Sequence, residues 1–213
     1  MNRNYKEIYD ESLKNPEEFW QKISEDVFWF KKPTKILKKD NPPFYKWFED
    51  GVTNTCYNAL DLHIDQGRGD KTALIYDSPI TGNKAKFTFK ELKEKVSKFA
   101  GALDKQGVKK GDRVIIYMPM IPEAVVAMLA CGRIGAIHSV VFGGFASNEL
   151  ASRIDDSKAK ILITASCGFE PGRTVEYRPL VDGALKLAKH QVEKVILFQR
   201  KGHEVKLNKP LEI

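Results

Sequence analysis

One loop of the sequence gathers residue types that could bind a phosphate. It follows a predicted strand, is long for a strand-to-helix connection, and contains the run Glu170, Pro171, Gly172 and Arg173. A turn at Pro171-Gly172 would present Arg173, whose guanidinium stays charged and can bind two phosphate oxygens at once. The alternative is a salt bridge from Arg173 to Glu170 or Glu176, and the residue types alone favour that alternative.

A pair of glycines after another predicted strand is the second candidate for ligand binding. Gly143 and Gly144 directly follow Phe142. Two glycines allow positive φ angles and let backbone N–H groups approach a ligand closely. The same pair could equally form a tight turn between a strand and a helix, so the spacing leaves both readings open.

The sequence shows no complete catalytic or metal-binding motif. His63, His138, His190 and His203 have no partner at metal-ligand spacing, and the three cysteines are far apart with no CxxC. The nucleophile elbow, the P-loop and the dinucleotide fingerprint are all absent. His138 falls in a predicted buried strand, where we expect a core histidine with a hydrogen-bond partner. We therefore predict no catalytic residue and no metal ligand in this chain.

The net charge of +7 does not indicate a nucleic-acid-binding protein. Lysines and arginines are spread along the chain and mixed with acids, as in KELKEK at 90–95, which is typical of solvated helix surfaces. The most apolar stretch, 118–146, is interrupted by prolines, glycines and charges, which argues against a membrane helix. The N-terminus has neither an apolar signal region nor a typical transit peptide. We expect no nucleic acid and no membrane, and a cytoplasmic location, with the mitochondrial matrix possible.

Positioning the two loops requires an α/β fold. Apolar periodicity predicts strands at 72–76, 86–89, 113–117, 136–142, 160–164 and 194–198, and helices from Leu92 to Gly107 and at 122–130, 147–155 and 180–189. Such alternating βαβ units form a mostly parallel sheet covered by helices. The apolar strand 136–142 is of the kind buried on both faces. Ligands in these folds bind beyond the carboxyl ends of strands, here the loops after Tyr117, Phe142 and Thr164.

Residues 1–65 form a separate, irregular and aromatic-rich extension before the domain at 66–213. We expect one helix with Asn15 as N-cap and Pro16 at the first helical position. Ser147 is likewise expected to cap its helix, and Thr88 to form a capping box with Glu91. The extension has too little regular structure to bury its aromatic rings. We interpret it as a segment that packs on the following domain, in preference to an aromatic ligand box.

Four segments resemble the short-chain acyl-CoA synthetases that form AMP. They are WF at 47–48 with CYNALDLH at 56–63, FTFKEL at 87–92, KGDRVIIYMPMIPEA at 110–124 running into AIHSVVFGGF at 136–145, and EPGR at 170–173 with VEY at 175–177. The last of these is similar to the propionyl-CoA synthetase branch. The resemblance covers nearly the whole chain from about Glu18, and the long run at 110–145 is highly specific.

The resemblance implies an enzyme that activates acetate or propionate with ATP and Mg²⁺, through an acyl-adenylate and pyrophosphate, and then transfers the acyl group to CoA. It implies a CoA site made by Phe142, Gly143 and Gly144 and by Glu170, Pro171, Gly172 and Arg173, with Arg173 meeting the nucleotide phosphates. Two positions depart from the family pattern. Leu62 replaces an arginine, and Glu170 stands where acetyl-type members have a second arginine.

The resemblance also implies an incomplete adenylate-forming domain. The chain ends before the phosphate loop, the adenine contacts, the acyl pocket and the domain with the catalytic lysine, so we expect the ATP and Mg²⁺ sites to lie outside it. We predict that the chain alone has no ligase activity. The alternative is a truncated, non-catalytic relative that binds CoA or a partner subunit. A half sheet is also expected to expose an unpaired edge and apolar surface.

Overall fold

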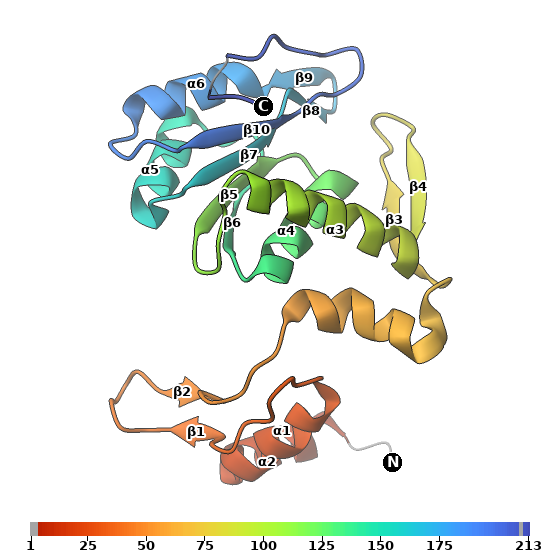
Figure 1. Cartoon of the computed structure of the whole chain (residues 1–213), viewed down its shortest axis with the longest axis vertical. Coiled ribbons are helices and arrows are strands. Elements are labelled where there is room, and N and C mark those ends of the chain that lie inside the picture. The colour runs from red at the N-terminus through yellow and green to blue at the C-terminus, as the bar shows by residue number, and fades with distance from the viewer. Residues whose placement is uncertain (1–3, 209–210) are drawn as a thin grey trace. The chain divides into compact units, whose positions relative to one another are not determined.

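The computed structural model describes residues 4–208 and 211–213 of the 213-residue chain. The chain divides into two compact units, one ending at Asn54 and the other spanning Thr55–Ile213 (Figure 1). The domain boundary expected near residue 65 stays a prediction, and residues 55–65 lie in the second compact unit.

The described part of the first unit, from residue 4 onward, contains three short helices and one small hairpin. Its elements are α1 (Tyr5–Lys14), α2 (Pro16–Ile23), the 3₁₀ helix η1 (Ser24–Asp26), β1 (Leu37–Lys38) and β2 (Lys46–Trp47). Helix α2 has Pro16 in its first turn as predicted, but the Asn15 side chain makes no capping hydrogen bond. The capping box lies one helix earlier, where Glu7 N donates to Asn4 Oδ1 at 2.9 Å and Asn4 N donates to Glu7 Oε2 at 3.3 Å.

Aromatic rings and one carboxylate hold the irregular part of this unit together. The Trp29 ring lies 5.6 Å from that of Phe48, and Trp29 Nε1 donates to the Ser24 carbonyl at 2.8 Å. Asp50 accepts hydrogen bonds from the hydroxyl and backbone N–H of Thr34 and from Lys35 N. Because these bonds favour the charged form, with that from the Thr34 hydroxyl the strongest, the pKa of Asp50 falls to about 2. The predicted packing of this extension on the next domain stays a prediction.

The second unit is an α/β layer structure with one parallel sheet. Its helices are η2 (Tyr57–Asp61), η3 (Ile64–Arg68), α3 (Phe89–Lys105), α4 (Pro122–Ile134), α5 (Ser147–Ser157) and α6 (Tyr177–Leu187). Its strands are β3 (Thr72–Asp77), β4 (Lys84–Thr88), β5 (Arg113–Met118), β6 (Ile137–Phe142), β7 (Ile161–Ala165), β8 (Cys167–Glu170), β9 (Arg173–Glu176) and β10 (Lys194–Phe198). The parallel sheet has the order β10-β7-β5-β6, which confirms the predicted class.

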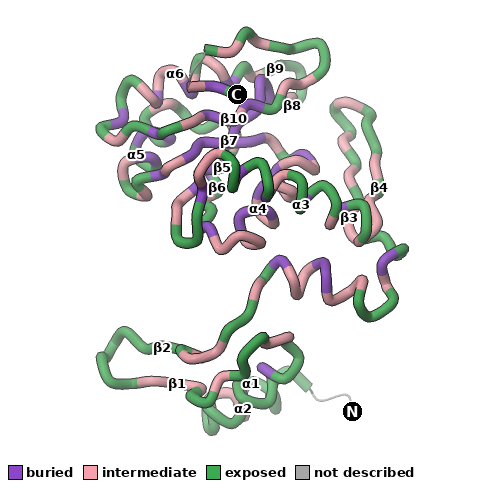
Figure 2. The backbone as a smooth tube through the Cα atoms, in the orientation of Figure 1, coloured by how far each residue is buried: buried purple, intermediate pink, exposed green. Residues whose placement is uncertain are grey.

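Helices cover both faces of this sheet, and strand residues alternate between two cores. Val114 and Ile116 of β5 pack with α3 and α4, whereas Ile115 and Tyr117 pack with α5 and α6. This period of two follows from the opposite directions of successive strand side chains. Every residue of β7 is buried, and Figure 2 shows this strand in purple. The capping box that starts α3 is confirmed, with Glu91 N donating to Thr88 Oγ1 at 3.2 Å.

Strand β6 corrects one prediction, because it is an edge strand and is not buried on both faces. It pairs with β5, and no other strand of the described residues pairs with its outer side. Val140 and Phe142 are 55% and 69% exposed, and only Val141 is buried. His138 is exposed as well, so it is not a core histidine. Its apolar sequence therefore indicates a strand that something else covers, since a solvated edge strand usually carries charges.

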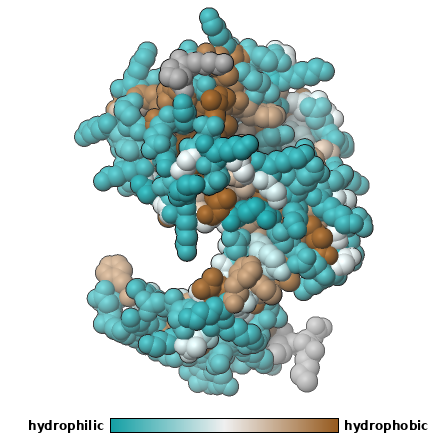
Figure 3. Space-filling model, in the orientation of Figure 1, coloured by the Kyte–Doolittle hydropathy of each residue, from teal (hydrophilic) through white to brown (hydrophobic). Residues whose placement is uncertain are grey.

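The segment 211–213 lies along the opposite edge of the sheet. Leu197 N donates to the Ile213 carbonyl at 2.9 Å, and Ile213 N donates to the Val195 carbonyl at 3.0 Å. Glu212 is 1% exposed and accepts from Arg178 Nη1 at 3.0 Å. Apolar side chains also reach the surface, and Figure 3 shows them in brown among mostly teal neighbours. No described helix is long and apolar enough to cross a membrane.

A buried carboxylate joins η2 to both helices of the first core. Asp61 is 7% exposed and contacts Arg133 of α4 and Lys93 of α3, with Asp61–Arg133 and Asp61–Lys93 distances of 2.5 and 2.9 Å. Burial opposes ionisation of this carboxyl, but the hydrogen bonds from Arg133 and Lys93 outweigh it, so the pKa of Asp61 lies below its ordinary value. Leu62, one of the two positions that depart from the pattern the sequence resembles, directly follows Asp61.

Candidate functional site

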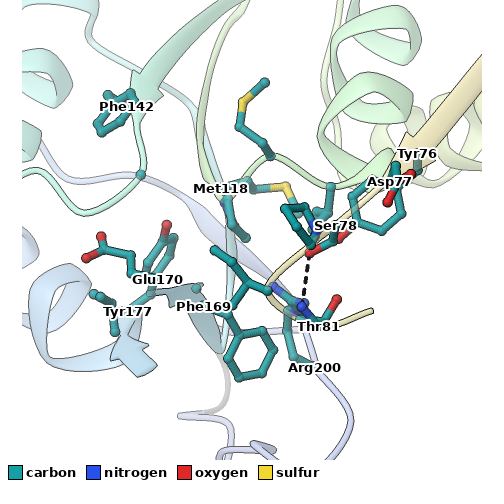
Figure 4. Close-up of a pocket in the computed structure, with 18 of the residues that line it drawn as sticks. Tyr76, Asp77, Ser78, Thr81, Met118, Phe142, Phe169, Glu170, Tyr177 and Arg200 are labelled. Atoms are coloured by element: carbon teal, nitrogen blue, oxygen red, sulfur yellow. Dashed lines mark hydrogen bonds between the residues drawn. The ribbon is translucent and has the colours of Figure 1, made fainter. Parts of the chain in front are cut away.

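The carboxyl ends of β5 and β6 and the β8–β9 hairpin that follows β7 line one pocket, at the edge of the sheet where the order of strands and helices predicted ligand binding. Its volume is about 350 Å³. Figure 4 shows side chains from these strand ends and from the β3–β4 hairpin around the same space. Of the predicted site residues, Phe142, Gly143 and Glu170 line it. Gly144, Pro171, Gly172 and Arg173 are not part of the lining.

The glycine loop after β6 is fixed by two tyrosines. Gly144 has a φ of +94°, a conformation that favours glycine. Tyr117, the residue of β5 beneath the loop, donates its hydroxyl to the Phe145 carbonyl at 2.7 Å. A Cβ at Gly143 would lie 2.2 Å from the Tyr177 hydroxyl oxygen and 2.9 Å from the Met118 carbonyl oxygen. Gly143 is therefore required for packing, whatever the loop binds.

Tyr177 is a pocket residue that sequence reasoning did not single out. It is the first residue of α6, is 3% exposed, and its ring lies 4.9 Å from that of Tyr117. Burial raises the pKa of Tyr177, and the neighbouring Tyr117 and Glu170 add to the shift. The predicted helix began at Leu180, so it left Tyr177 in a loop. The observed helix begins at Tyr177 itself, which places the ring under the glycine pair.

The segment after β7 corrects a second prediction, because it forms a hairpin where a long loop was expected. Strands β8 and β9 are antiparallel and pair Glu170 with Arg173. The turn at Pro171-Gly172 is confirmed, and Gly172 has a φ of +75°. Ser147 corrects a third, since it starts α5 without capping it and donates its hydroxyl to the Leu180 carbonyl at 2.8 Å.

Arg173 forms the salt bridge that its residue type favoured. Its Nε and Nη2 atoms lie 2.8 and 2.7 Å from Glu170 Oε2. The Arg173 side chain is 71% exposed and that of Glu170 is 40% exposed. An exposed pair of this kind contributes only about 0–1 kcal/mol. A phosphate could therefore replace Glu170 as the partner of the guanidinium at a small cost in free energy.

A second arginine lies at the pocket itself. Arg200 follows β10, lines the cavity, and places its guanidinium 4.5 Å from the centre of the Phe169 ring. Its backbone N–H donates to Ser166 Oγ at 2.9 Å, which fixes its place beside β7. Sequence reasoning missed Arg200 because it stands alone between a strand and a turn. No local spacing relates it to Phe169, which lies a strand, a helix and another strand earlier in the chain.

The described residues contain no group of three or more His, Cys, Asp or Glu side chains that could hold a metal ion. Among these described residues, no side-chain cluster fits a resident Mg²⁺ ion. Two of the histidines have structural contacts. His63 Nδ1 accepts from Arg68 Nε at 3.0 Å, and His190 Nε2 lies 2.9 Å from the Ala159 carbonyl oxygen.

Comparison with known proteins agrees with the fold and with the sequence motifs. Residues 63–210 match the family described as AMP-binding enzyme, and residues 5–59 match the acetyl-coenzyme A synthetase N-terminus. A solved structure, acetoacetyl-CoA synthetase from Streptomyces lividans, superposes with a TM-score of 0.86 at 25% identity, covering 100% of this chain and 32% of that one.

Two curated relatives are similar over most of this chain. Human acyl-CoA synthetase short-chain family member 3, mitochondrial, is 56% identical over 200 residues, which are 94% of this chain and 29% of that protein. Acetyl-coenzyme A synthetase from Streptomyces avermitilis is 47% identical over 199 residues, which are 93% of this chain and 30% of that protein. The chain thus spans less than a third of the length of these relatives. It belongs to the AMP-binding enzyme family, and it is similar to short-chain acyl-CoA synthetases over less than a third of their length.

Proposed function

We propose that this chain supplies one side of the CoA site of an AMP-forming short-chain acyl-CoA synthetase. The whole enzyme would convert acetate or propionate, ATP and CoA to acyl-CoA, AMP and pyrophosphate. The observation that carries the proposal is the position of the glycine loop and of the Glu170–Arg173 turn. Both lie at the carboxyl edge of a parallel sheet, which is where this class of fold binds its ligands.

The charge pattern supports two separate contact regions for CoA, one at the exposed turn and one beside the pocket. Arg173 lies on an exposed turn and is held only by a weak surface pair, so it can meet the nucleotide phosphates of CoA. Glu170 repels a phosphate, so its role is to orient Arg173 through the salt bridge. Phe142, Gly143 and Gly144 contribute a ring and backbone beside the pocket, and Pro171 and Gly172 shape the turn.

Replacing Arg173 with alanine tests the CoA site. In a full-length enzyme that carries this segment, we expect Arg173→Ala to raise the KM for CoA about tenfold, because a charge-assisted hydrogen bond contributes roughly 1.5–3 kcal/mol. The carboxylate-dependent adenylation half-reaction should be largely unchanged. Pyrophosphate exchange measures the adenylation half-reaction, and thioester formation measures the transfer of the acyl group to CoA.

Arg153→Ala is the matched control, since Arg153 is exposed on α5 and away from the pocket lining. It should change neither half-reaction. Equal damage to both half-reactions by Arg173→Ala would show that Arg173 is structural and contradict the proposal.

The chain by itself is expected to have no ligase activity. We propose that the ATP and Mg²⁺ sites lie outside it, in agreement with its coverage of 29% and 30% of the two relatives. Incubation with ATP, Mg²⁺, CoA and either acetate or propionate should give no carboxylate-dependent AMP, as measured by chromatography. Detectable AMP that depends on the carboxylate would show that the chain is catalytically competent.

The choice of carboxylate and the cellular location are further parts of this proposal. The EPGR turn at 170–173 favours the propionyl-type branch. We keep the cytoplasm as the proposed compartment, with the mitochondrial matrix as the alternative. The name of the human relative, which includes the word mitochondrial, supports that alternative.

A further inference from the structure

Strand β6 leaves one long edge of the parallel sheet open. It is the outermost strand on its side (Figure 1), and no other strand among residues 4–208 and 211–213 pairs with its outer edge. The opposite edge, at β10, already pairs with the segment 211–213. An open edge strand is a template for pairing with another chain, because its outward backbone groups have no partner in the sheet.

The outward N–H groups of β6 belong to His138, Val140 and Phe142. Ile137 N donates to the Asp112 carbonyl at 2.8 Å, so the backbone of Ile137 faces β5. Successive residues of a strand point their backbone groups to opposite sides, so every second residue from His138 faces outward. The register with β5 runs without a bulge along the whole strand. The edge therefore offers three residues in phase for pairing with a further strand.

Edge strands usually carry a feature that prevents such pairing, and β6 has none in its sequence. That sequence, IHSVVF, contains no lysine, no acid and no proline. Two of its side chains, Val140 and Phe142, are 55% and 69% exposed. By contrast, strand β4 of the small hairpin sheet carries the exposed lysines Lys84 and Lys86. The open edge of the parallel sheet is thus of the kind that a second strand covers.

The strand is complementary to a second copy of itself. An antiparallel pair with a two-fold axis at Val140 places Val140 opposite Val140 of the second copy, and His138 opposite Phe142. All three outward residues then belong to hydrogen-bonded pairs, whereas an axis one residue away pairs only two of them with each other. No like charges face each other in this register, and apolar and aromatic pairs across strands are stabilising.

The charges beside the two ends of β6 are opposite in sign. Lys110 lies against Gly135, before the strand, where a Cβ would be 3.0 Å from Lys110 Cγ. Glu170 lies beside Gly144, after the strand, with its Oε1 3.5 Å from the position of a Cβ. An antiparallel copy brings the start of one strand beside the end of the other, and hence Lys110 toward Glu170 of the second copy. Glu170 also pairs with Arg173, so this attraction adds to the pairing only weakly.

We propose that two copies of this chain associate through β6, as an antiparallel pair with its two-fold axis at Val140, so that their two parallel sheets join into one. Each copy offers one open edge of this length among its described residues, so the pairing uses both edges and closes at two copies. His138 of the second copy then stands beside Phe142, which lines the pocket. The interface is small, so the association is weak and depends on concentration. The inference does not rest on the proposed CoA site.

Analytical ultracentrifugation of the 213-residue chain over a dilution series tests the association. The weight-average mass should rise with concentration from 24.2 kDa, the mass of one chain, toward twice that value. Val140→Lys places two lysines directly opposite each other at the axis and should weaken the association about tenfold. Ile75→Lys is the matched control, since Ile75 is also β-branched and is 65% exposed on the separate hairpin sheet. It should leave the association unchanged, and circular dichroism checks that both variants are folded.

Cysteine cross-linking tests the register. Val140→Cys should form a disulfide between two copies on mild oxidation, because the axis places the two cysteines in one pair, with Cα atoms about 5.5 Å apart. His138→Cys should not, since its two copies would lie four residues apart, about 13 Å along the strands. The natural cysteines are buried, so the unmodified chain should not cross-link.

Each other outcome overturns the pairing or its register. A mass that stays at 24.2 kDa over the whole series would show that the chain does not self-associate. Unchanged association of Val140→Lys would place the interface elsewhere, and a mass that rises beyond two copies would show open-ended aggregation through apolar side chains. If Val140→Lys does not fold, the two cysteine variants still decide, because cross-linking of His138→Cys in place of Val140→Cys contradicts the register. The proposed CoA site is tested separately by Arg173→Ala and stands or falls on that result.

Discussion

Replacing Asp61 with asparagine is expected to lower the free energy of unfolding of the second unit by about 3 kcal/mol. The side chain is 7% exposed and faces two cations, Arg133 and Lys93. Removing one partner of a buried ion pair leaves an uncompensated charge, which costs roughly 3–5 kcal/mol. Urea unfolding followed by circular dichroism measures the loss. Tryptophan fluorescence does not serve, because every tryptophan of the chain lies in the first unit.

The pH dependence of this loss provides a second readout. The pKa of Asp61 is lowered in the folded state, so its contribution is fully present above the unfolded value of about 3.9 and is lost as the pH falls through the folded value. The difference between the original chain and Asp61→Asn should therefore be constant near neutral pH and shrink below about pH 4.

Asp70→Asn is the matched control for the same chemical change. Asp70 pairs with Lys90 at 2.9 Å, but its side chain is 86% exposed, so the loss should stay below about 1 kcal/mol. A similar effect of the two substitutions would show that the Asp61 cluster does not anchor η2 to α3 and α4.

A methyl group at Gly143 is expected to destabilise the second unit by about 2 kcal/mol, the middle of the range of roughly 1–3 kcal/mol for inserting a methyl group into a tightly packed region. The Cβ of Gly143→Ala would lie 2.2 Å from the Tyr177 hydroxyl oxygen and 2.9 Å from the backbone oxygen of Met118. Neither atom can move easily, because Tyr177 is buried and the Met118 oxygen belongs to the backbone. The same unfolding measurement gives the value.

A double variant separates the contact with Tyr177 from the contact with Met118. Adding Tyr177→Phe to Gly143→Ala removes the oxygen at 2.2 Å and should restore part of the loss, but the contact at 2.9 Å remains. Gly101→Ala is the control, because Gly101 lies within α3 and a Cβ there meets nothing within 4 Å. It should stabilise the unit by up to about 1 kcal/mol, the helix-propensity difference between the two residues. A neutral Gly143→Ala would show that Tyr177 can shift freely.

The sequence predicted most of the elements because their signals are local. Thr88 and Glu91 form their capping box within one helical turn. Gly135, with a φ of +74°, ends α4, and a glycine after an apolar helical segment is a local signal for the end of a helix. Strands β5 and β7 are continuous apolar runs that are buried on both faces. The turn at Pro171-Gly172 was also predicted from its residue types alone.

The position of strand β6 at the edge of the sheet could not be predicted from such local signals. Its sequence is mostly apolar, yet Val140 and Phe142 are exposed. An apolar run predicts that other residues cover the strand, but it does not identify the segment that covers it. Whether a strand lies inside or at the edge of a sheet depends on strand order, which arises from contacts between distant residues.

By itself, the sequence determined the α/β class, the order of strands and helices, the glycine loop at 143–144 and the arginine turn at 170–173. These depend on backbone preferences and apolar periods within a few residues. Only the tertiary structure decided that the partner of Arg173 is Glu170 and not Glu176, that Asp61 joins η2 to α3 and α4, and that Tyr177 and Arg200 line the same pocket. Tyr177 and Gly143 are far apart in the sequence, and the register of a parallel sheet and its crossover helices places them in contact. No local pattern records such a contact, so the polar group of the pocket could be found only once the sheet was assembled.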